Sequence, residues 1–336
     1  MSGKSLLNTV LILFVLLQGF SGNAQVLRKR TTLLMGGRFD ISIVAGDSLT
    51  AEQNIAIVIA EITRIENLIS DWKSDSQVSE VNQNAGIRAV KVDREVFELT
   101  QRAIQLSEIT HGGFDISFAA MDKIWKFDGS MTGMPSAEAI KKSVEKVGYK
   151  NIILDSVQST IFLKSEGMKI GFGALGEGYA TDKCRDIMLA KGIKAGIVNG
   201  SGDMTAWGKQ PNGRDWSIGI TNPFHPEDLF AVVPLNNGAV TTSGSYEKFV
   251  VFDGKRYSHI INPATGYPAT GLCSVTVFGP NAETANGLST SLMVLGQKEG
   301  LLLLQKFSGY SCIMITDNGK VITSKHFPIK KFKAKL

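Results

Sequence analysis

Two short segments in the C-terminal third carry residue types that catalysis and metal binding use. Residues 258–266 place His259 at the end of an apolar strand, just before a Pro/Gly turn. Residues 284–296 place Asn286 and Thr290 four positions apart at the start of a helix, so both side chains project from one face. A histidine and two small oxygen donors indicate an acid/base group beside a site for a hard cation. Taken alone, each residue is more often part of a packed core.

The composition is that of a folded protein. The chain has 336 residues, of which 43% are hydrophobic and 20% charged, with a net charge of +5. This length suits one large domain or two medium ones, and the hydrophobic content argues against disorder. Much of the positive charge lies at residues 28–30 and 330–335, where solvated tails usually carry it. No basic patch interleaved with aromatic residues occurs in the sequence, so nucleic-acid binding is not indicated.

The first 24 residues have the pattern of a secretory signal peptide. Lys4 supplies the positive charge, residues 6–17 form the apolar run, and residues 22–24 offer a small-residue cleavage site before Gln25. No lipobox cysteine accompanies this site, so lipid attachment is not indicated. We expect an extracytoplasmic protein, periplasmic or secreted, whose mature domain is residues 25–336. An uncleaved N-terminal anchor is the alternative.

The hydrophobic pattern predicts an α+β fold, with mixed or antiparallel sheets flanked by helices. Helical periodicity marks residues 49–68, 93–110, 135–147, 178–190, 282–295 and 298–307. Strands are predicted at residues 31–44 (a pair broken at 36–37), 151–154, 160–163, 168–171 and 195–199, then in a series to 278 and in a hairpin around 317–319. A soft subdivision is expected near residue 150. The three cysteines, Cys184, Cys273 and Cys312, lack metal-ligand spacing and are expected to be buried free thiols.

Glycine-rich turns precede several polar residues. Residues 171–176 fit GxGxxG between an apolar stretch and a helix, a context in which backbone amides bind phosphate. Asp203 lies where a dinucleotide fold would place its ribose-binding acid, but the strands are too short and closely spaced for a doubly wound sheet. Asp115 and Asp203 each follow such a turn, which indicates either a shared polar site or simple turn caps. Trp72, in a polar loop, is either a surface-packing residue or a wall for a flat ligand.

Eight segments of the sequence, in order, resemble the FAD:protein FMN transferase family, also called ApbE. They are MGGRFDISI (35–43), LISDWKSDSQVSEVN (68–82), GGFDIS (112–117) with IWKF (124–127), IGFGALGEGYATD (170–182), VNGSGDMTAWG (198–208), TTSGSYEKF (241–249), SHIINPATGYP (258–268) and TANGLSTSLMVLG (284–296). The match runs from about residue 34 to 304, nearly all of the mature chain. No single segment is decisive, but eight in the family's order are highly specific.

The resemblance implies an enzyme that binds FAD with Mg²⁺ and moves the FMN part onto a threonine, or sometimes serine, hydroxyl of an acceptor protein, releasing AMP. The positions where the family contacts FAD correspond to Met35, Trp72, Phe114, Asp115 and Ile260. The positions that hold the metal correspond to the carbonyl of Ala174 and the side chains of Asn286 and Thr290. His259 falls at the histidine of the HIxxP motif, the acid/base. The implied partners are FAD and the acceptor, which can be membrane-associated.

This chain departs from the family pattern around the implied cation. Gly171 stands where the family has Asp, Glu177 where it has Lys, and Asn286 where it has the metal-binding Asp. Gly37 replaces a Thr, and Ser245 replaces an Asp. Gly171 and Glu177 are counted among the cofactor-binding positions. We hypothesise that Glu177 takes over a carboxylate role lost at Gly171 or at Asn286. The alternative is a surface glutamate in a chain with weakened metal binding.

Other functions stay open at this point. The same site would hydrolyse FAD to FMN and AMP if water replaced the protein hydroxyl. A flavin-binding protein without catalysis is a different class, favoured by the missing carboxylate at Asn286. A nicotinamide-dependent dehydrogenase is a more distant alternative.

Overall fold

The fold is built on one eight-stranded antiparallel sheet. The structure, a computed structural model, describes residues 25–246, 248–325 and 327. The strands lie in the order β1-β2-β6-β7-β10-β13-β14-β15, and each neighbouring pair is antiparallel. Their bounds are β1 Val26–Leu34, β2 Gly37–Ala45, β6 Ala195–Gly200, β7 Asp203–Trp207, β10 Gly238–Gly244, β13 Leu272–Gly279, β14 Ser311–Thr316 and β15 Val321–Thr323.

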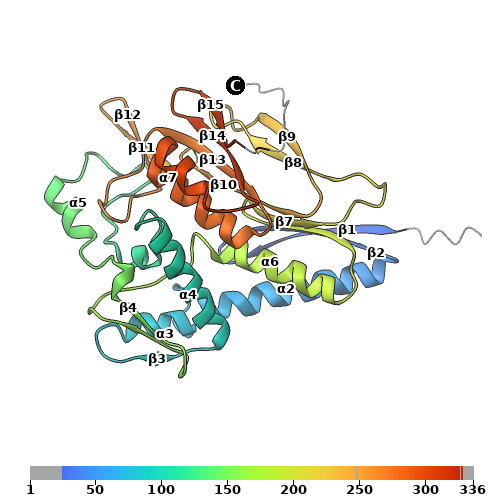
Figure 1. Ribbon diagram of the computed structural model, residues 1–336, viewed down its shortest axis with the longest axis horizontal. Helices are drawn as coiled ribbons and strands as arrows, with labels where there is room; N and C mark the ends of the chain where they lie inside the picture. Colours follow the sequence, from blue (N-terminus) through green and yellow to red (C-terminus); the bar gives the residue numbers. More distant parts are fainter. Residues whose placement is uncertain (1–24, 247, 326, 328–336) are drawn as a thin grey trace, which may run out of the picture.

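Three helices cover one face of this sheet, and a hairpin packs on the other. The helices are α2 (Ser48–Ile69), α6 (Gly176–Ala190) and α7 (Ala282–Leu304), which run below the sheet in Figure 1. The hairpin is β8 (Trp216–Thr221) with β9 (Leu229–Leu235). Because side chains alternate along a strand, β14 turns Cys312 and Met314 toward the helices, and Ile313 toward the hairpin. The sheet therefore has two apolar faces, each with its own core.

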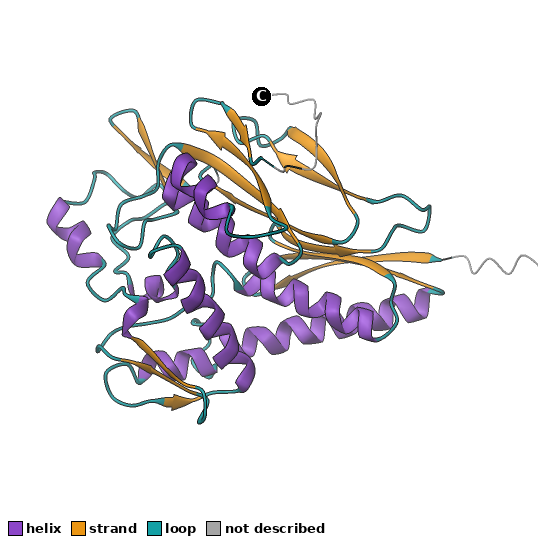
Figure 2. Ribbon diagram, viewed as in Figure 1, coloured by secondary structure: helices purple, strands orange, loops and turns teal. Residues whose placement is uncertain are grey.

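The remaining elements extend from the helical side and carry loops toward one end of the sheet (Figure 2). The helices are α3 (Gln77–Gln83), α4 (Arg94–Ile109) and α5 (Ala137–Ser143), with 3₁₀ turns η1 (Ile116–Ala120) and η2 (Tyr149–Asn151). A small sheet joins β3 (Val90–Lys91), β5 (Thr160–Leu163) and β4 (Ile152–Asp155). A separate hairpin pairs β11 (Phe249–Phe252) with β12 (Lys255–Ser258), immediately before His259.

The predicted α+β fold is confirmed, and most predicted elements lie where periodicity placed them. The break expected between residues 295 and 298 is a kink in α7 at Gly296, whose φ of 74° interrupts the helix. All three cysteines are buried and free, as expected. No helix within the described residues is long and apolar enough to cross a membrane. The expected leader, residues 1–24, lies outside the described residues.

Several local predictions were wrong. Residues 168–171 form no strand, because Asn82 rather than a neighbouring strand binds the backbone of Ile170. The helix expected over 135–147 is only Ala137–Ser143, capped by Ser136. Helix α3 was missed, since seven polar-rich residues give too little periodicity. The N-cap of α2 is Asp47, whose carboxylate accepts from Thr50 N at 2.8 Å, so the helix begins at Ser48, one residue before the predicted bound.

Candidate active site

A cavity of about 620 Å³ opens where the glycine-rich turns and loops meet at one end of the main sheet. Its lining comes from the turn before α6, the β6–β7 turn, the end of β10, the loop around η1, the segment after β12, and α7. Segments far apart in the chain therefore meet in one place. The volume lies in the range that ordinarily accommodates small-molecule ligands.

Ten of the eleven predicted site residues line this cavity. They are Trp72, Phe114, Asp115, Gly171, Ala174, Glu177, His259, Ile260, Asn286 and Thr290. The exception among the described residues is Met35, in the β1–β2 turn with a φ of 52°. Its Cε lies 3.3 Å from where a Cβ on Gly176 would stand, so Met35 packs against the start of α6. The structure brings these residues together, and their individual roles stay predictions.

The turn before α6 carries Ala174, which lines the cavity. Backbone N–H groups donate to Phe172 O, from Leu175 N at 2.9 Å, and to Leu175 O, from Tyr179 N at 2.8 Å. None of the backbone hydrogen bonds found at this turn, within the described residues, goes to Ala174 O.

The antiparallel sheet also rules out a doubly wound dinucleotide fold around the GxGxxG segment. Its last glycine instead allows close packing, since a Cβ on Gly176 would lie 3.1 Å from Ile69 Cδ1.

Asp203, Glu177 and Asn286 form the polar floor of the cavity. Asp203 is 7% exposed and accepts a short hydrogen bond at Oδ2 from Asn286 Nδ2. Burial, then the charge of Glu177, raises the pKa of Asp203 well above its usual value. Burial also raises the pKa of Glu177, which is opposed by a hydrogen bond from Ser201. Among the described residues, neither carboxylate forms an ion pair with a lysine, arginine or histidine.

Thr290 is held at the cavity by neighbouring hydroxyl groups. Its Oγ1 lies 3.3 Å from Ser243 Oγ, which in turn lies 2.8 Å from Ser289 Oγ. Ser289 Oγ also donates to Asn286 O at 2.9 Å, which ties the two helical positions together. Asn286 and Thr290 thus share one face of α7, as their spacing predicted.

His259 is oriented by the backbone of the β11–β12 hairpin. Both its backbone N, at 3.0 Å, and its ring Nδ1, at 3.1 Å, contact the carbonyl oxygen of Lys248. Since a carbonyl only accepts, this contact favours the tautomer with hydrogen on Nδ1 and places the ring lone pair on Nε2. Phe127 meets the imidazole edge-on, with ring centroids 6.4 Å apart.

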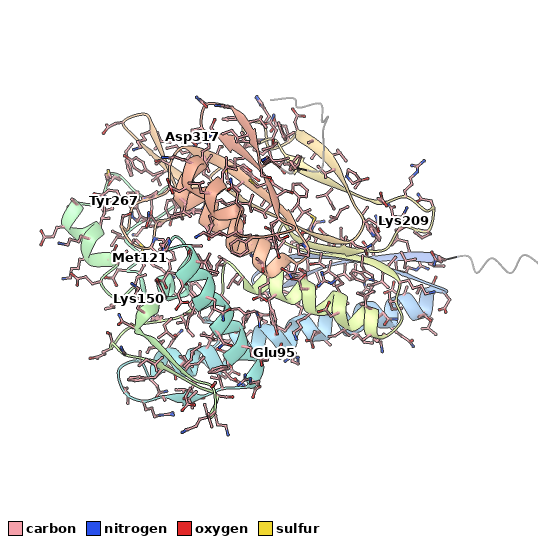
Figure 3. The ribbon with its side chains drawn as sticks, viewed as in Figure 1. Glu95, Met121, Lys150, Lys209, Tyr267 and Asp317 are labelled. Atoms are coloured by element: carbon pink, nitrogen blue, oxygen red, sulfur yellow. The ribbon has the colours of Figure 1, made fainter. Side chains whose placement is uncertain are left out.

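The loop that carries Phe127 is fastened to the segment after His259. Trp125 Nε1 donates to Gly266 O at 2.9 Å and joins Ile261 in a separate apolar cluster. Figure 3 labels Met121, which precedes Trp125 in the first segment, and Tyr267, which follows Gly266 in the second. The position of the histidine thus depends on contacts between distant parts of the chain.

Asp115 and Trp72 occupy opposite kinds of environment. The Asp115 carboxylate accepts from Ser117 N at 2.8 Å and from Tyr149 N at 2.9 Å, so the turn-cap interpretation describes its contacts well. Burial raises the pKa of Asp115, whereas these hydrogen bonds oppose the rise. Trp72 is 80% exposed at the cavity rim, with Lys123 Nζ 4.2 Å from its ring centroid. An exposed indole at a cavity rim can stack on a flat ligand.

The oxygen donors around the floor fit a hard divalent cation such as Mg²⁺. No group of three or more His, Cys, Asp or Glu side chains that could hold a metal occurs within the part of the chain that the structure describes. A cation here would therefore draw on neutral oxygens as well, and Ala174 O, Asn286 and Thr290 supply a carbonyl, an amide and a hydroxyl. Oxygen ligands of this kind suit Mg²⁺ and do not favour softer metals.

Sequence reasoning missed some cavity residues. Asp71 Oδ2 lies 3.1 Å from where a Cβ on Gly171 would stand, although the two are a hundred residues apart. Ser201 and Ser243 line the cavity from the β6–β7 turn and the end of β10. Asp203 was singled out for its glycine-rich turn and as a ribose-binding acid, and was not placed beside Asn286. Ser201 has a φ of 50°, and the NGSG run around it was the one available signal of a tight turn.

Comparisons with known proteins agree over nearly the whole chain. The ApbE family profile matches residues 35–314. The FAD:protein FMN transferase of Klebsiella pneumoniae (strain 342) is 31% identical over 292 residues, which cover 85% of this chain and 83% of that protein. The protein of the same name from Treponema pallidum (strain Nichols) is 31% identical over 274 residues, covering 77% and 76%.

Solved structures show the same arrangement. The ApbE protein of Thermotoga maritima aligns with a TM-score of 0.80 at 30% identity, covering 90% of this chain and 98% of that chain. The apo form of Pseudomonas stutzeri flavinyl transferase ApbE aligns with a TM-score of 0.78 at 29% identity, covering 90% and 95%. With the family profile spanning most of its length, this chain belongs to the ApbE family.

Proposed function

We propose that this chain transfers FMN from FAD to a threonine or serine hydroxyl of an acceptor protein, with release of AMP. The support for FMN transfer is family membership together with relatives named FAD:protein FMN transferase over more than three quarters of this chain. The reaction breaks the bond between the FMN phosphorus and the bridging pyrophosphate oxygen. The acceptor hydroxyl oxygen forms the new bond to phosphorus, and AMP leaves with the electron pair.

One observation carries the mechanism: His259 and the cation-type donors line the same cavity. With hydrogen on Nδ1 bound to Lys248 O, Nε2 of His259 is the atom that would accept the proton of the attacking hydroxyl. The contact with Lys248 O orients the imidazole ring. His259 is therefore the proposed general base.

Ala174 O, Asn286 and Thr290 are the proposed Mg²⁺ ligands. Bound Mg²⁺ would neutralise charge on the pyrophosphate, which matters because phosphoryl transfer depends mainly on positioning and electrostatic stabilisation. Ser243 and Ser289 orient the hydroxyl of Thr290 through their own hydroxyl groups.

The flavin ring is proposed to lie between apolar walls. Phe114 and Ile260 line the cavity, and Trp72 stands at its rim. Such residues contact a flat aromatic ligand without ionic partners. Met35 and Asp115 would support these walls, Met35 through the start of α6 and Asp115 through the turn around η1.

We further propose that the enzyme acts outside the cytoplasm, on the basis of the leader pattern in residues 1–24. Its acceptor would be an extracytoplasmic protein, free or membrane-associated, with an accessible threonine or serine. Fractionation of cells that express the full chain would test this location.

The activity is tested by incubating the protein with FAD, Mg²⁺ and a domain that carries a flavinylation threonine. Mass spectrometry follows the acceptor, and chromatography follows the nucleotides. Acceptor mass gain equal to FMN, with AMP release, is the expected result. AMP with free FMN and no acceptor gain would indicate hydrolysis, and intact bound FAD would indicate a binder.

His259→Ala tests the proposed base in the same assay. Loss of a positioned general base should slow transfer by roughly 10²- to 10⁴-fold. FAD binding, measured by flavin fluorescence, should persist because apolar walls hold the ring. Transfer at the wild-type rate by His259→Ala would remove this residue from the mechanism.

A further inference from the structure

Glu177 occupies space that exists only because residue 37 is glycine. Glu177 lies in the first turn of α6 and lines the cavity. A Cβ on Gly37 would stand 2.8 Å from Glu177 Oε1 and 2.0 Å from Ser201 Oγ. Both distances are shorter than an ordinary van der Waals contact. A threonine at position 37, the residue that the family resemblance expects, would therefore displace the Glu177 carboxylate or the Ser201 hydroxyl that binds it.

The family resemblance expects carboxylates at positions 171 and 286, and a different acidic side chain lies near each of these positions. Beside Gly171, the carboxylate of Asp71 fills the nearby space, with Oδ2 3.1 Å from a Cβ at that position. Asn286 Nδ2 donates to Asp203, and Ser201, which binds the Glu177 carboxylate, lies two residues before Asp203 in the β6–β7 turn. Glu177 is therefore the candidate replacement for the carboxylate missing at Asn286, and Asp71 is the candidate replacement for the one missing at Gly171.

The charge balance of the floor favours a bound cation. Glu177 and Asp203 line the same cavity, and no ion pair from a lysine, arginine or histidine to either is found among the described residues. An opposite charge bound between two such carboxylates would stabilise their ionised forms. Asn286 uses its amide nitrogen on Asp203, so its carbonyl oxygen is the atom left for a cation.

We propose that Glu177 supplies the cation-binding carboxylate of this site, in place of the aspartate that the family resemblance expects at position 286, and that Gly37 makes room for it. Asn286 then contributes a neutral oxygen and holds Asp203 in place. The negative charge is retained, but it comes from α6 instead of α7. This inference rests on the proposed function, because it concerns the cation of that reaction.

Mn²⁺ binding to the full chain tests this proposal without catalysis, with free Mn²⁺ counted by electron paramagnetic resonance. Glu177→Gln should weaken Mn²⁺ binding by about 10- to 100-fold. Asn286→Asp, added to Glu177→Gln, should restore most of the lost affinity by returning the carboxylate to α7. Gly37→Ala keeps every carboxylate, yet should also weaken binding because it displaces the Glu177 carboxylate or the Ser201 hydroxyl that binds it. Circular dichroism checks that each variant is folded.

Asp71→Asn is the matched control, since it removes a carboxylate from the same cavity on the side of Gly171. Its Mn²⁺ affinity should stay near the wild-type value. Any one of three results would overturn the assignment to Glu177. These are wild-type Mn²⁺ affinity in Glu177→Gln, an equal loss of affinity in Asp71→Asn, and no recovery of affinity in the folded double variant. Wild-type affinity in Gly37→Ala would overturn the role of Gly37. Glu177-dependent Mn²⁺ binding without FMN transfer by the wild type would refute only the proposed function.

Discussion

Replacing Gly178 by alanine should separate the two helices that carry the site. Gly178 lies in α6, where a Cβ would stand 2.6 Å from Ala282 O and 2.9 Å from Glu283 N at the start of α7. The nearest atoms are backbone, so no side-chain rotation can relieve the contact. Inserting a methyl group into such a packed position typically costs about 1–3 kcal/mol of unfolding free energy.

The opposing term is helix propensity, which by itself favours alanine over glycine by about 0.8–1.0 kcal/mol. The clash is the larger effect, so Gly178→Ala should lower the unfolding free energy. Equilibrium urea unfolding followed by tryptophan fluorescence measures it. Gly46→Ala is the control, because nothing lies within 4 Å of its Cβ position. Its φ is not in the left-handed region, so the expected change is small and, if anything, stabilising.

Gly178→Ala should also weaken Mn²⁺ binding, since Ala174 and Glu177 lie at the α6 end of the contact and Asn286 at the α7 end. Stability equal to or above that of the wild type would refute the argument that backbone contact between α6 and α7 demands glycine. A loss of stability in Gly46→Ala of similar size would show that the effect is not specific to the helix contact.

The other predictions concern a buried acid and the cavity rim. Burial is the main cause that raises the pKa of Asp182 to about 6, from 3.8. Between these pH values the folded state keeps a proton that the unfolded chain releases, so this group's contribution to stability falls as pH rises through the window. Asp182→Asn removes this pH-dependent destabilisation. The unfolding free energy of the variant minus that of the wild type should therefore increase by up to about 3 kcal/mol from pH 4 to pH 7. A difference that does not change with pH would contradict this. Trp72→Ala should raise the Kd for FAD by roughly 5- to 150-fold, corresponding to about 1–3 kcal/mol of stacking, with little change in stability because the indole is 80% exposed. An unchanged Kd in flavin fluorescence titrations would remove Trp72 from the binding site.

Local signals in the sequence account for what could be predicted. The strand pair around residues 36–37, helix α6 and the kink at Gly296 follow from hydrophobic periodicity and from glycine at positive φ. The face shared by Asn286 and Thr290 follows from helix geometry. Errors arose where non-local contacts prevail over local pattern, as at residues 168–171, where Asn82 takes the place of a strand partner.

The sequence by itself determined most of the elements, the order of the family motifs and ten residues of the cavity, because each of these is written in short, local patterns. Only the tertiary structure decided which acidic side chain lies near each position that departs from the family pattern. Asp71 lies beside Gly171, a hundred residues away in the sequence, and the Glu177 carboxylate lies in the space that the absence of a side chain at Gly37 leaves open. The physical reason is that these distances depend on how α6, α7 and the β6–β7 turn pack, which no local pattern encodes.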